Sequence, residues 1–237
     1  MGITRKLSFV GKLEALERIQ TRGGGRYQVF EDPMWPLGVF GDLTNTRHVF
    51  FITKPALAQW ILPLAKSRRC LFLCRYGLPM QATLRATRWF SDSLGLPISF
   101  VGDIDPISLT TFLVYRSRSS GLRSLRRRWL PMEWCGVDDE WLKLCERYLK
   151  KKYRLDSLFV QMSAVEKEHF KLLDPLLPEL EMAIGQRSMK ILRSSRVLGI
   201  EGACNPALYV DGFPVRLLER LIQRSSATPR PVTINER

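Results

Sequence analysis

The stretch "PISFVGDIDPISLTTF", residues 97–112, joins an apolar run to a helical pattern through two aspartates, Asp103 and Asp105. The apolar run predicts a short buried strand over 97–103, and the proline after the second aspartate suits the first turn of a helix over 106–116. This order predicts that both carboxylates lie at the C-terminal end of a strand. In open α/β sheets, that end of the strands is where ligands bind.

Two more strand-and-helix units come before this stretch. Short β-rich runs at 48–53 and 69–76 predict strands, and helical patterns follow them at 55–67 and 79–95. Strands that alternate with helices of this length predict βαβ units. The fold class is therefore α/β, with a mostly parallel sheet flanked by helices.

The residues beyond 154 are mainly helical in pattern. Ser163 and Glu166 have the spacing of a capping box before one helical run, and the last residues lack apolar periodicity, which is typical of a flexible tail. We find no internal repeat. We expect one α/β domain with a helical C-terminal extension, divided into an N-terminal segment (1–35), the α/β domain (36–154), its helical C-terminal part (155–224) and a flexible tail (225–237).

The chain is strongly basic. It has 37 lysines and arginines against 23 aspartates and glutamates, a formal net charge of +14. An excess of this size favours nucleic acid or an anionic membrane face as partner, although a surface that only maintains solubility is the alternative. The basic residues gather in an arginine run without acids and at the end of a later helix, where the helix dipole also favours lysine. The candidate nucleic-acid-binding residues are Arg116, Arg118, Arg123, Arg126, Arg127, Arg128, Lys150, Lys151 and Lys152.

Cysteine usage and hydropathy indicate an intracellular, soluble protein. The five cysteines form no Cys-x-x-Cys pair, so a metal-thiolate site is not expected, and Cys70 and Cys74 are interpreted as packing residues of a strand. No uncharged apolar run reaches the roughly 18 residues that a membrane-spanning helix needs. We therefore expect a reduced compartment and no membrane partner.

The paired aspartates have two interpretations. Two carboxylates at the end of a strand suit Mg2+, which takes oxygen ligands and needs only one or two protein carboxylates when phosphate completes its shell. Such an ion would polarise a phosphoryl oxygen of a phosphodiester. Alternatively, Asp103 caps the helix that begins at Pro106, and Asp105 forms the turn before it. The spacing leaves both interpretations open.

Several segments together resemble the Toprim domain of the topoisomerase VI A subunit and Spo11 family. The resemblance covers residues from about 36 to 190, and its most specific element is Asp-x-Asp-Pro in "FVGDIDP". The similar segments, in the order of the family, are "PLGVFGDLT" (36–44), "HVFFITKPALAQWI" (48–61), "CRYGLP" (74–79), "FVGDIDP" (100–106), "MEWCGVDDEWL" (132–142) and "DSLFVQMSAVEKEHFKLLDPLL" (156–177).

The resemblance implies a Toprim fold, Mg2+ held by Asp103 and Asp105, DNA as the preferred partner, and a nuclear or nucleoid location. It also implies a homodimer or a further protein subunit. The sequence departs from the family at the end of the first strand, where Thr53 and then Lys54 stand in place of a glutamate that serves as metal ligand or acid/base. Ser108 replaces a common glycine.

Other parts of the family's catalytic apparatus have no clear equivalent. Glu201 and Asp42 are the candidates for a third carboxylate. About 35 residues precede the matching region, too few for the winged-helix domain that carries the family's cleavage tyrosine. Tyr27 is a poor substitute, so the cleavage tyrosine is expected on another chain.

Three functional hypotheses follow. The first is a DNA-binding component of a topoisomerase VI A or Spo11-type assembly, with Asp103 and Asp105 holding Mg2+. The second is a non-catalytic architectural module that binds RNA or protein, in which the Lys54 ammonium pairs with one of the two aspartates and replaces the metal. The third is a metal-dependent DNA nuclease of the kind found in plasmid defence.

Overall fold

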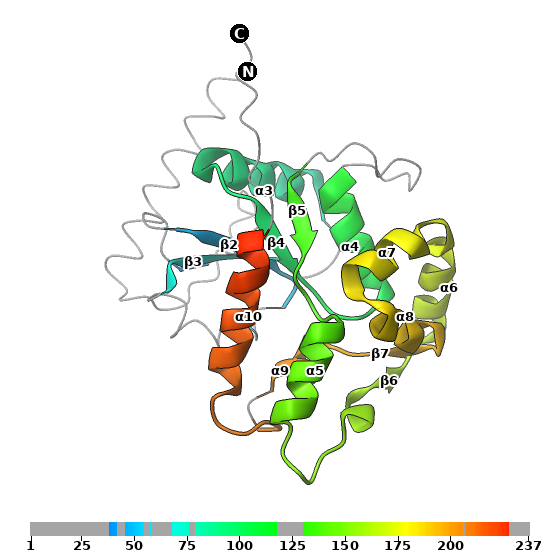
Figure 1. The fold of residues 1–237 in the computed structure, drawn as a ribbon. Helices are drawn as coiled ribbons and strands as arrows, with labels where there is room; N and C mark the ends of the chain where they lie inside the picture. The colour runs from blue at the N-terminus through cyan, green and yellow to red at the C-terminus, as the bar shows by residue number, and fades with distance from the viewer. Residues whose placement is uncertain are drawn as a thin grey trace.

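The structure is a computed structural model of the protein. A five-stranded sheet lies at its centre (Figure 1). The residues that the structure describes are 38–41, 46–54, 57, 68–75, 79–117, 130–205 and 207–227. The strand order is β1-β3-β2-β4-β5. The strands are β1 (Gly38–Gly41), β2 (His48–Ile52), β3 (Cys70–Cys74), β4 (Ile98–Val101) and β5 (Met132–Trp134).

The sheet is mostly parallel. Strand β2 pairs in parallel with β3 and β4, β5 pairs in parallel with β4, and β1 is antiparallel to β3. This confirms the predicted α/β class and the three strands expected from the sequence, each of which is one to three residues shorter than expected. Strands β1 and β5 were not expected from the sequence, because with four and three residues they present little periodicity.

The strand order reverses at β2. From β2 the chain moves outward to β3, and it then crosses back over β2 to β4 and β5 on the other side. The C-terminal ends of β2 and β4 therefore form the topological switch point of the sheet. This is the edge at which doubly wound folds bind their ligands.

Helices cover both faces of the sheet. The crossover helices α3 (Gln81–Leu94) and α4 (Pro106–Ser117) confirm two predicted helices. On the α4 side, Phe51 stacks 5.5 Å from Phe100 and contacts Tyr115. The preceding residue of β2, Phe50, points to the opposite face of the sheet, as expected for a pleated strand. The helix expected at 55–67 lies mostly outside the described residues.

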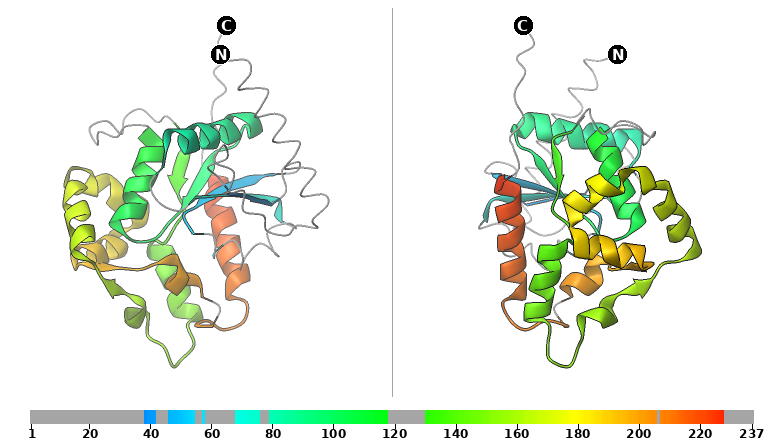
Figure 2. Two further views of the ribbon diagram at one scale, coloured as in Figure 1. Left: turned by 180° about the vertical axis from the view of Figure 1, so that it is seen from behind. Right: turned by 45° about the vertical axis from the view of Figure 1, so that its right-hand side comes forward.

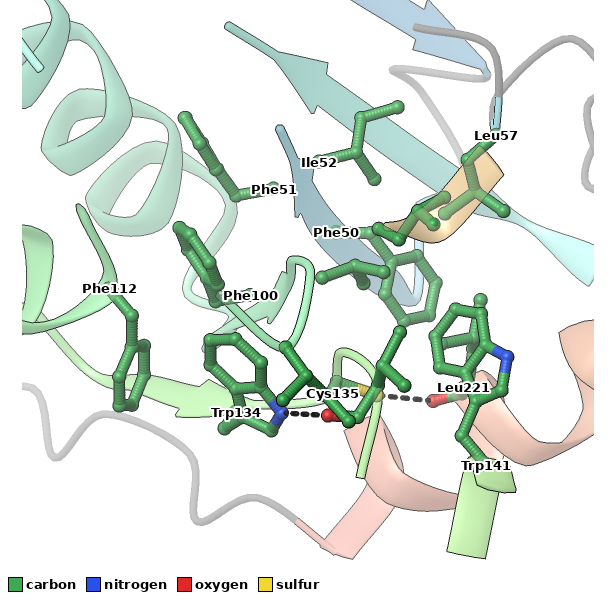
Figure 3. Close-up of a cluster of buried hydrophobic side chains, with 14 of the residues drawn as sticks. Phe50, Phe51, Ile52, Leu57, Phe100, Phe112, Trp134, Cys135, Trp141 and Leu221 are labelled. Atoms are coloured by element: carbon green, nitrogen blue, oxygen red, sulfur yellow. Dashed lines mark hydrogen bonds between the residues drawn. The ribbon is translucent and has the colours of Figure 1, made fainter. Parts of the chain in front are cut away.

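The opposite face is covered by two helices from later in the chain, α5 (Asp139–Tyr148) and α10 (Phe213–Ala227). Figure 3 shows Trp141 of α5 and Leu221 of α10 on the same side as Phe50, with Leu221 O accepting the Cys135 thiol 3.7 Å away. One continuous hydrophobic core joins the sheet to these helices. The C-terminal part therefore belongs to the same packed unit as the sheet.

The C-terminal part is mainly helical, as predicted. The capping box of Ser163 and Glu166 is present at the start of its first helix, while Gly185, at φ 92°, separates two helices. A two-stranded sheet that the sequence analysis did not anticipate joins β6 to β7. The elements are β6 (Val160–Gln161), α6 (Ala164–Leu172), α7 (Leu177–Ile184), α8 (Gln186–Arg193), β7 (Arg196–Val197) and α9 (Ile200–Cys204), with 3-10 helices at Leu155–Leu158 and Asp174–Leu176.

The C-terminal helix extends beyond its expected end. Helix α10 continues through Ala227, three residues past the boundary placed at 224. Ser225 was expected in a flexible tail, but it is buried, and its hydroxyl lies 3.4 Å from Nδ1 of His48. The last turn of α10 is mostly polar, so it shows no apolar periodicity in the sequence. Its packing is evident only from the contact of Ser225 with His48 of β2. The rest of the expected tail, 228–237, lies outside the described residues.

All five cysteines are buried and free. Burial raises the pKa of Cys70 and of Cys74 to about 12. The two thiols are therefore protonated at neutral pH, and they pack in β3 as predicted. Within the described ranges, no helix is both long and apolar enough to cross a membrane.

Two adjacent aspartates after β5 hold three helices in place. The Asp138 carboxylate caps α5 by accepting the Trp141 N–H at 2.8 Å, and it forms an ion pair with Arg220 of α10. The Asp139 carboxylate accepts the N–H groups of Arg187 and Ser188, at 3.0 and 2.7 Å, at the start of α8.

We predict that Asp138→Ala lowers the free energy of unfolding by about 3–5 kcal/mol, because it leaves a buried guanidinium without its carboxylate and α5 without its cap. Arg220 has only 10% of its side chain exposed. The control is Asp156→Ala, which removes an 84% exposed carboxylate 4.0 Å from Arg196. This control substitution should lower the free energy of unfolding by no more than about 0.5 kcal/mol. Urea denaturation measures both values, and equal losses would contradict the assigned role of Asp138.

Candidate functional site

A lysine and an aspartate meet at the topological switch point. Lys54 follows β2 and Asp103 follows β4, and the Thr53 N–H donates to Val101 O at 3.2 Å where the two strands end. The Lys54 Nζ lies 2.8 Å from Asp103 Oδ2. Asp103 has 3% of its side chain exposed and Lys54 has 21%. The switch point is thus filled by an ion pair between neighbouring parallel strands.

The other oxygen of Asp103 binds the C-terminal part of the chain. Its Oδ1 accepts the N–H of Ile200, the first residue of α9, at 2.8 Å. Ile104 and Leu198 exchange two backbone hydrogen bonds of 3.1 Å beside it. The segment between β7 and α9 therefore covers Asp103, and the carboxylate caps a helix that is remote in sequence.

The buried position of Asp103 sets its protonation. Burial raises the pKa of Asp103 to about 7, and the nearby Asp105 carboxylate acts in the same direction. The Lys54 ammonium and the Ile200 N–H act in the opposite direction, because both stabilise the ionised form. The charge of Asp103 is therefore sensitive to pH near neutrality.

Asp105 has a local structural role. Its Oδ1 accepts the Ser108 N–H at 2.6 Å and its Oδ2 accepts the Ser108 hydroxyl at 3.2 Å, at the start of α4. The capping interpretation of the sequence was therefore right about α4 but wrong about the residue, because Asp105 caps α4 and Asp103 caps α9. The Ser108 hydroxyl thus adds a second donor to this cap.

Glycines that follow β4 and β5 bring the two strand ends together. Gly136 packs directly on the backbone of Gly102, so a Cβ atom at 136 would collide with the N and O atoms of Gly102. A Cβ atom at 102 would come within 2.7 Å of the Phe100 ring. The Val137 N–H also donates to Gly102 O at 3.0 Å. This close approach fixes the backbone from which Asp103 projects.

The residues at this edge do not fit a magnesium ion. Each carboxylate oxygen of Asp103 and Asp105 already has a protein donor. Thr53 is buried, and its hydroxyl has no hydrogen-bond partner among the described residues. In the described part of the chain, no three His, Cys, Asp or Glu side chains gather in a metal-binding group. The two candidates for a third carboxylate, Asp42 and the Glu201 side chain, lie outside the described residues.

The structure does not bring the described basic candidates together. Arg116 lies in the last turn of α4, near the start of β5, and its carbonyl accepts the Leu130 N–H at 3.4 Å. The Lys150–Lys152 turn follows α5, which begins at the other end of β5, so the two groups lie far apart (Figures 1 and 2). The remaining arginine candidates lie outside the described residues; they are Arg118, Arg123, Arg126, Arg127 and Arg128.

Two of these basic residues are partly engaged within the protein. Arg116 has 17% of its side chain exposed, stacks over the Phe112 ring and lies 3.9 Å from Glu133. Lys150 donates to Ala207 O at 2.9 Å. Lys151 and Lys152 are exposed. Among the described basic candidates, Lys151 and Lys152 are therefore the best placed to contact a phosphate.

Two of the four described tyrosines lie in the core, whereas Tyr148 and Tyr153 are half-buried. Tyr115 and Tyr209 are buried, and burial raises the pKa of each phenol. Tyr209 donates its hydroxyl proton to Gly202 O at 3.1 Å. Tyr27 lies outside the described residues.

A scan of the chain against protein-family models and a search of curated proteins both found no match. The Toprim resemblance therefore remains a prediction from the order of the motifs.

We predict that Lys54→Met destabilises the protein more at high pH than at low pH. The folded pKa of Asp103, about 7, lies above its ordinary value of 3.8, so stability falls as pH rises between the two values. Without Lys54 the folded pKa rises further, and the decline continues above pH 7.

Urea denaturation should show that Lys54→Met costs about 1–3 kcal/mol more near pH 9 than near pH 5.5. Adding Asp103→Asn to Lys54→Met should abolish the extra cost, because no carboxylate remains to be ionised. A cost that is equal at both pH values would contradict the pairing.

Proposed function

We propose that the chain is a Toprim-like component of a topoisomerase VI A or Spo11-type DNA-cleaving assembly, which binds nucleic acid but does not cleave it. In this proposal Lys54 supplies the positive charge that a metal ion supplies in the family that the sequence resembles, and the cleavage tyrosine is on another chain. The observation that carries the proposal is the 2.8 Å contact of Lys54 with Asp103 at the switch point.

The ammonium group explains why the site would keep its aspartates without catalysis. It neutralises a buried carboxylate, which would otherwise destabilise the fold. It has no open coordination position, so it can neither polarise a phosphoryl oxygen nor activate a bound water as Mg2+ does. The contact of Asp103 with Ile200 gives the carboxylate a second structural role. Asp103 would thus be retained because it joins the sheet to α9.

The charge of the chain supports a nucleic-acid partner. A net charge of +14 attracts a polyanion over a long range. Contacts to phosphates carry no sequence information, so binding through them is not sequence-specific. We expect DNA to be preferred, as in the family that the sequence resembles, and a nuclear or nucleoid location. A further subunit or a second copy of the chain would supply the tyrosine domain.

We predict that the protein binds a short DNA duplex independently of Mg2+. Fluorescence anisotropy at constant ionic strength should show that Mg2+ does not increase the affinity relative to EDTA, and the logarithm of the binding constant should fall linearly with the logarithm of salt concentration. Supercoiled plasmid incubated with the protein and Mg2+ should stay intact.

Two results would contradict the proposal. Mg2+-dependent nicking that Asp103→Asn abolishes would favour the nuclease hypothesis. Tighter binding of an RNA duplex than of a DNA duplex of equal length would favour the architectural module that binds RNA.

A further inference from the structure

Three arginines lie at the N-terminal edge of the sheet. They are not among the basic candidates named from the sequence. Arg47 precedes β2, and Arg68 and Arg69 precede β3. The two strands are parallel neighbours in a register that pairs His48 with Cys70, and the Arg47 N–H donates to Arg69 O at 2.8 Å. Because neighbouring strands lie about 4.8 Å apart, Arg47 and Arg69 start from adjacent backbone positions.

These arginines carry charge that the described residues do not neutralise. All three are exposed. Many exposed cations elsewhere in the protein have an acidic neighbour, as in the pair of Arg187 with Glu146. No carboxylate among the described residues forms an ion pair with Arg47, Arg68 or Arg69. The field of Arg47 also acts on His48, whose pKa is lowered first by burial and then by this guanidinium.

The backbone at Arg69 is unusual for a residue other than glycine. Its φ angle is 57°, in the left-handed region that side chains with a Cβ atom disfavour. The conformation is held because its carbonyl accepts the N–H groups of Arg47 and His48, at 2.8 and 3.4 Å. Glycine or asparagine would satisfy the same geometry with less strain. Arginine at this position therefore indicates a use for its side chain.

The described residues on either side of the segment 118–129 lie at the same edge of the sheet. The chain passes residue 117 at the end of α4 and returns at Leu130, just before β5. Strand β5 is parallel to β4 and β2, so its start lies on the N-terminal edge, and β4 alone separates it from β2. Between these two points the sequence contains five of the arginine candidates, which lie outside the described residues: Arg118, Arg123, Arg126, Arg127 and Arg128.

We propose that the N-terminal edge of the parallel strands, around Arg47, Arg68 and Arg69, is the surface that binds the phosphate backbone of duplex DNA. This edge is opposite to the one that carries Lys54 and Asp103, so DNA binds away from the switch point. The inference rests on the proposed function, in which the chain binds nucleic acid. Guanidinium groups suit this partner because they form two parallel hydrogen bonds to a phosphate.

The test removes the three charges and measures binding of a short DNA duplex. The variant is Arg47→Ala with Arg68→Ala and Arg69→Gly, in which glycine accommodates the left-handed backbone. The matched control is Arg147→Ala with Arg154→Ala and Lys190→Ala, which removes the same charge from exposed positions in the part of the chain after β5. Circular dichroism and urea denaturation establish that both variants fold.

The edge variant should weaken binding at least about tenfold and reduce the salt slope by about two to three, since each lost phosphate contact removes about 0.9 from the slope. The control should weaken binding less than about threefold, by its net charge alone. If the edge variant does not fold, Arg47→Ala with Arg68→Ala leaves the Arg69 backbone intact and should still weaken binding more than a control that changes only Arg147 and Arg154.

The outcomes separate the two proposals. If the wild type binds no duplex at low salt, the proposed function fails, and this inference fails with it. If the wild type binds but the edge variant and the control lose affinity equally, the proposed function stands and the edge is not the binding surface. Binding of an acidic protein domain, with no binding of DNA, would also overturn the inference.

Discussion

Carboxylates in the segments that follow β4 and β5 cap four of the helices around the sheet, and the placement of these helices depends on them. The first N–H groups of a helix have no partner inside the helix, and a carboxylate satisfies them while complementing the helix dipole. Buried charge is costly, so cations offset it at two of the four positions, Lys54 beside Asp103 and Arg220 beside Asp138. The four aspartates and the helices that they cap are Asp103 with α9, Asp105 with α4, Asp138 with α5 and Asp139 with α8.

This constraint explains why a basic chain keeps paired acids at the edge where ligands usually bind. The oxygen atoms that suit Mg2+ also suit an amide N–H or an ammonium group, and the surrounding fold determines which of these reaches them. At Asp103 the Ile200 amide and Lys54 are in contact with the carboxylate. The proposal of a non-catalytic component rests on this competition among donors. We therefore expect DNA to bind at the opposite edge of the sheet, where Arg47, Arg68 and Arg69 are exposed.

The sequence predicted the elements with strong local patterns and missed relations between distant residues. The β2, β3 and β4 strands, the α3 and α4 helices and the capping box at Ser163 were all expected from periodicity and spacing. The sequence assigned the cap of α4 to Asp103 and not to Asp105, and it missed the cap of α9 because the partner of Asp103 lies 97 residues away. Arg47 and Arg69 are unremarkable in the sequence, since only parallel strand pairing makes them neighbours.

By itself, the sequence determined the α/β class, the mostly parallel sheet, the strong positive charge and the position of two aspartates at a strand end. These properties follow from composition and from patterns that repeat within a few residues. Only the tertiary structure decided that Lys54 pairs with Asp103 and that α9 covers the carboxylate. The physical reason is that a carboxylate binds whichever donor the fold brings within about 3 Å, and that donor can come from any part of the chain.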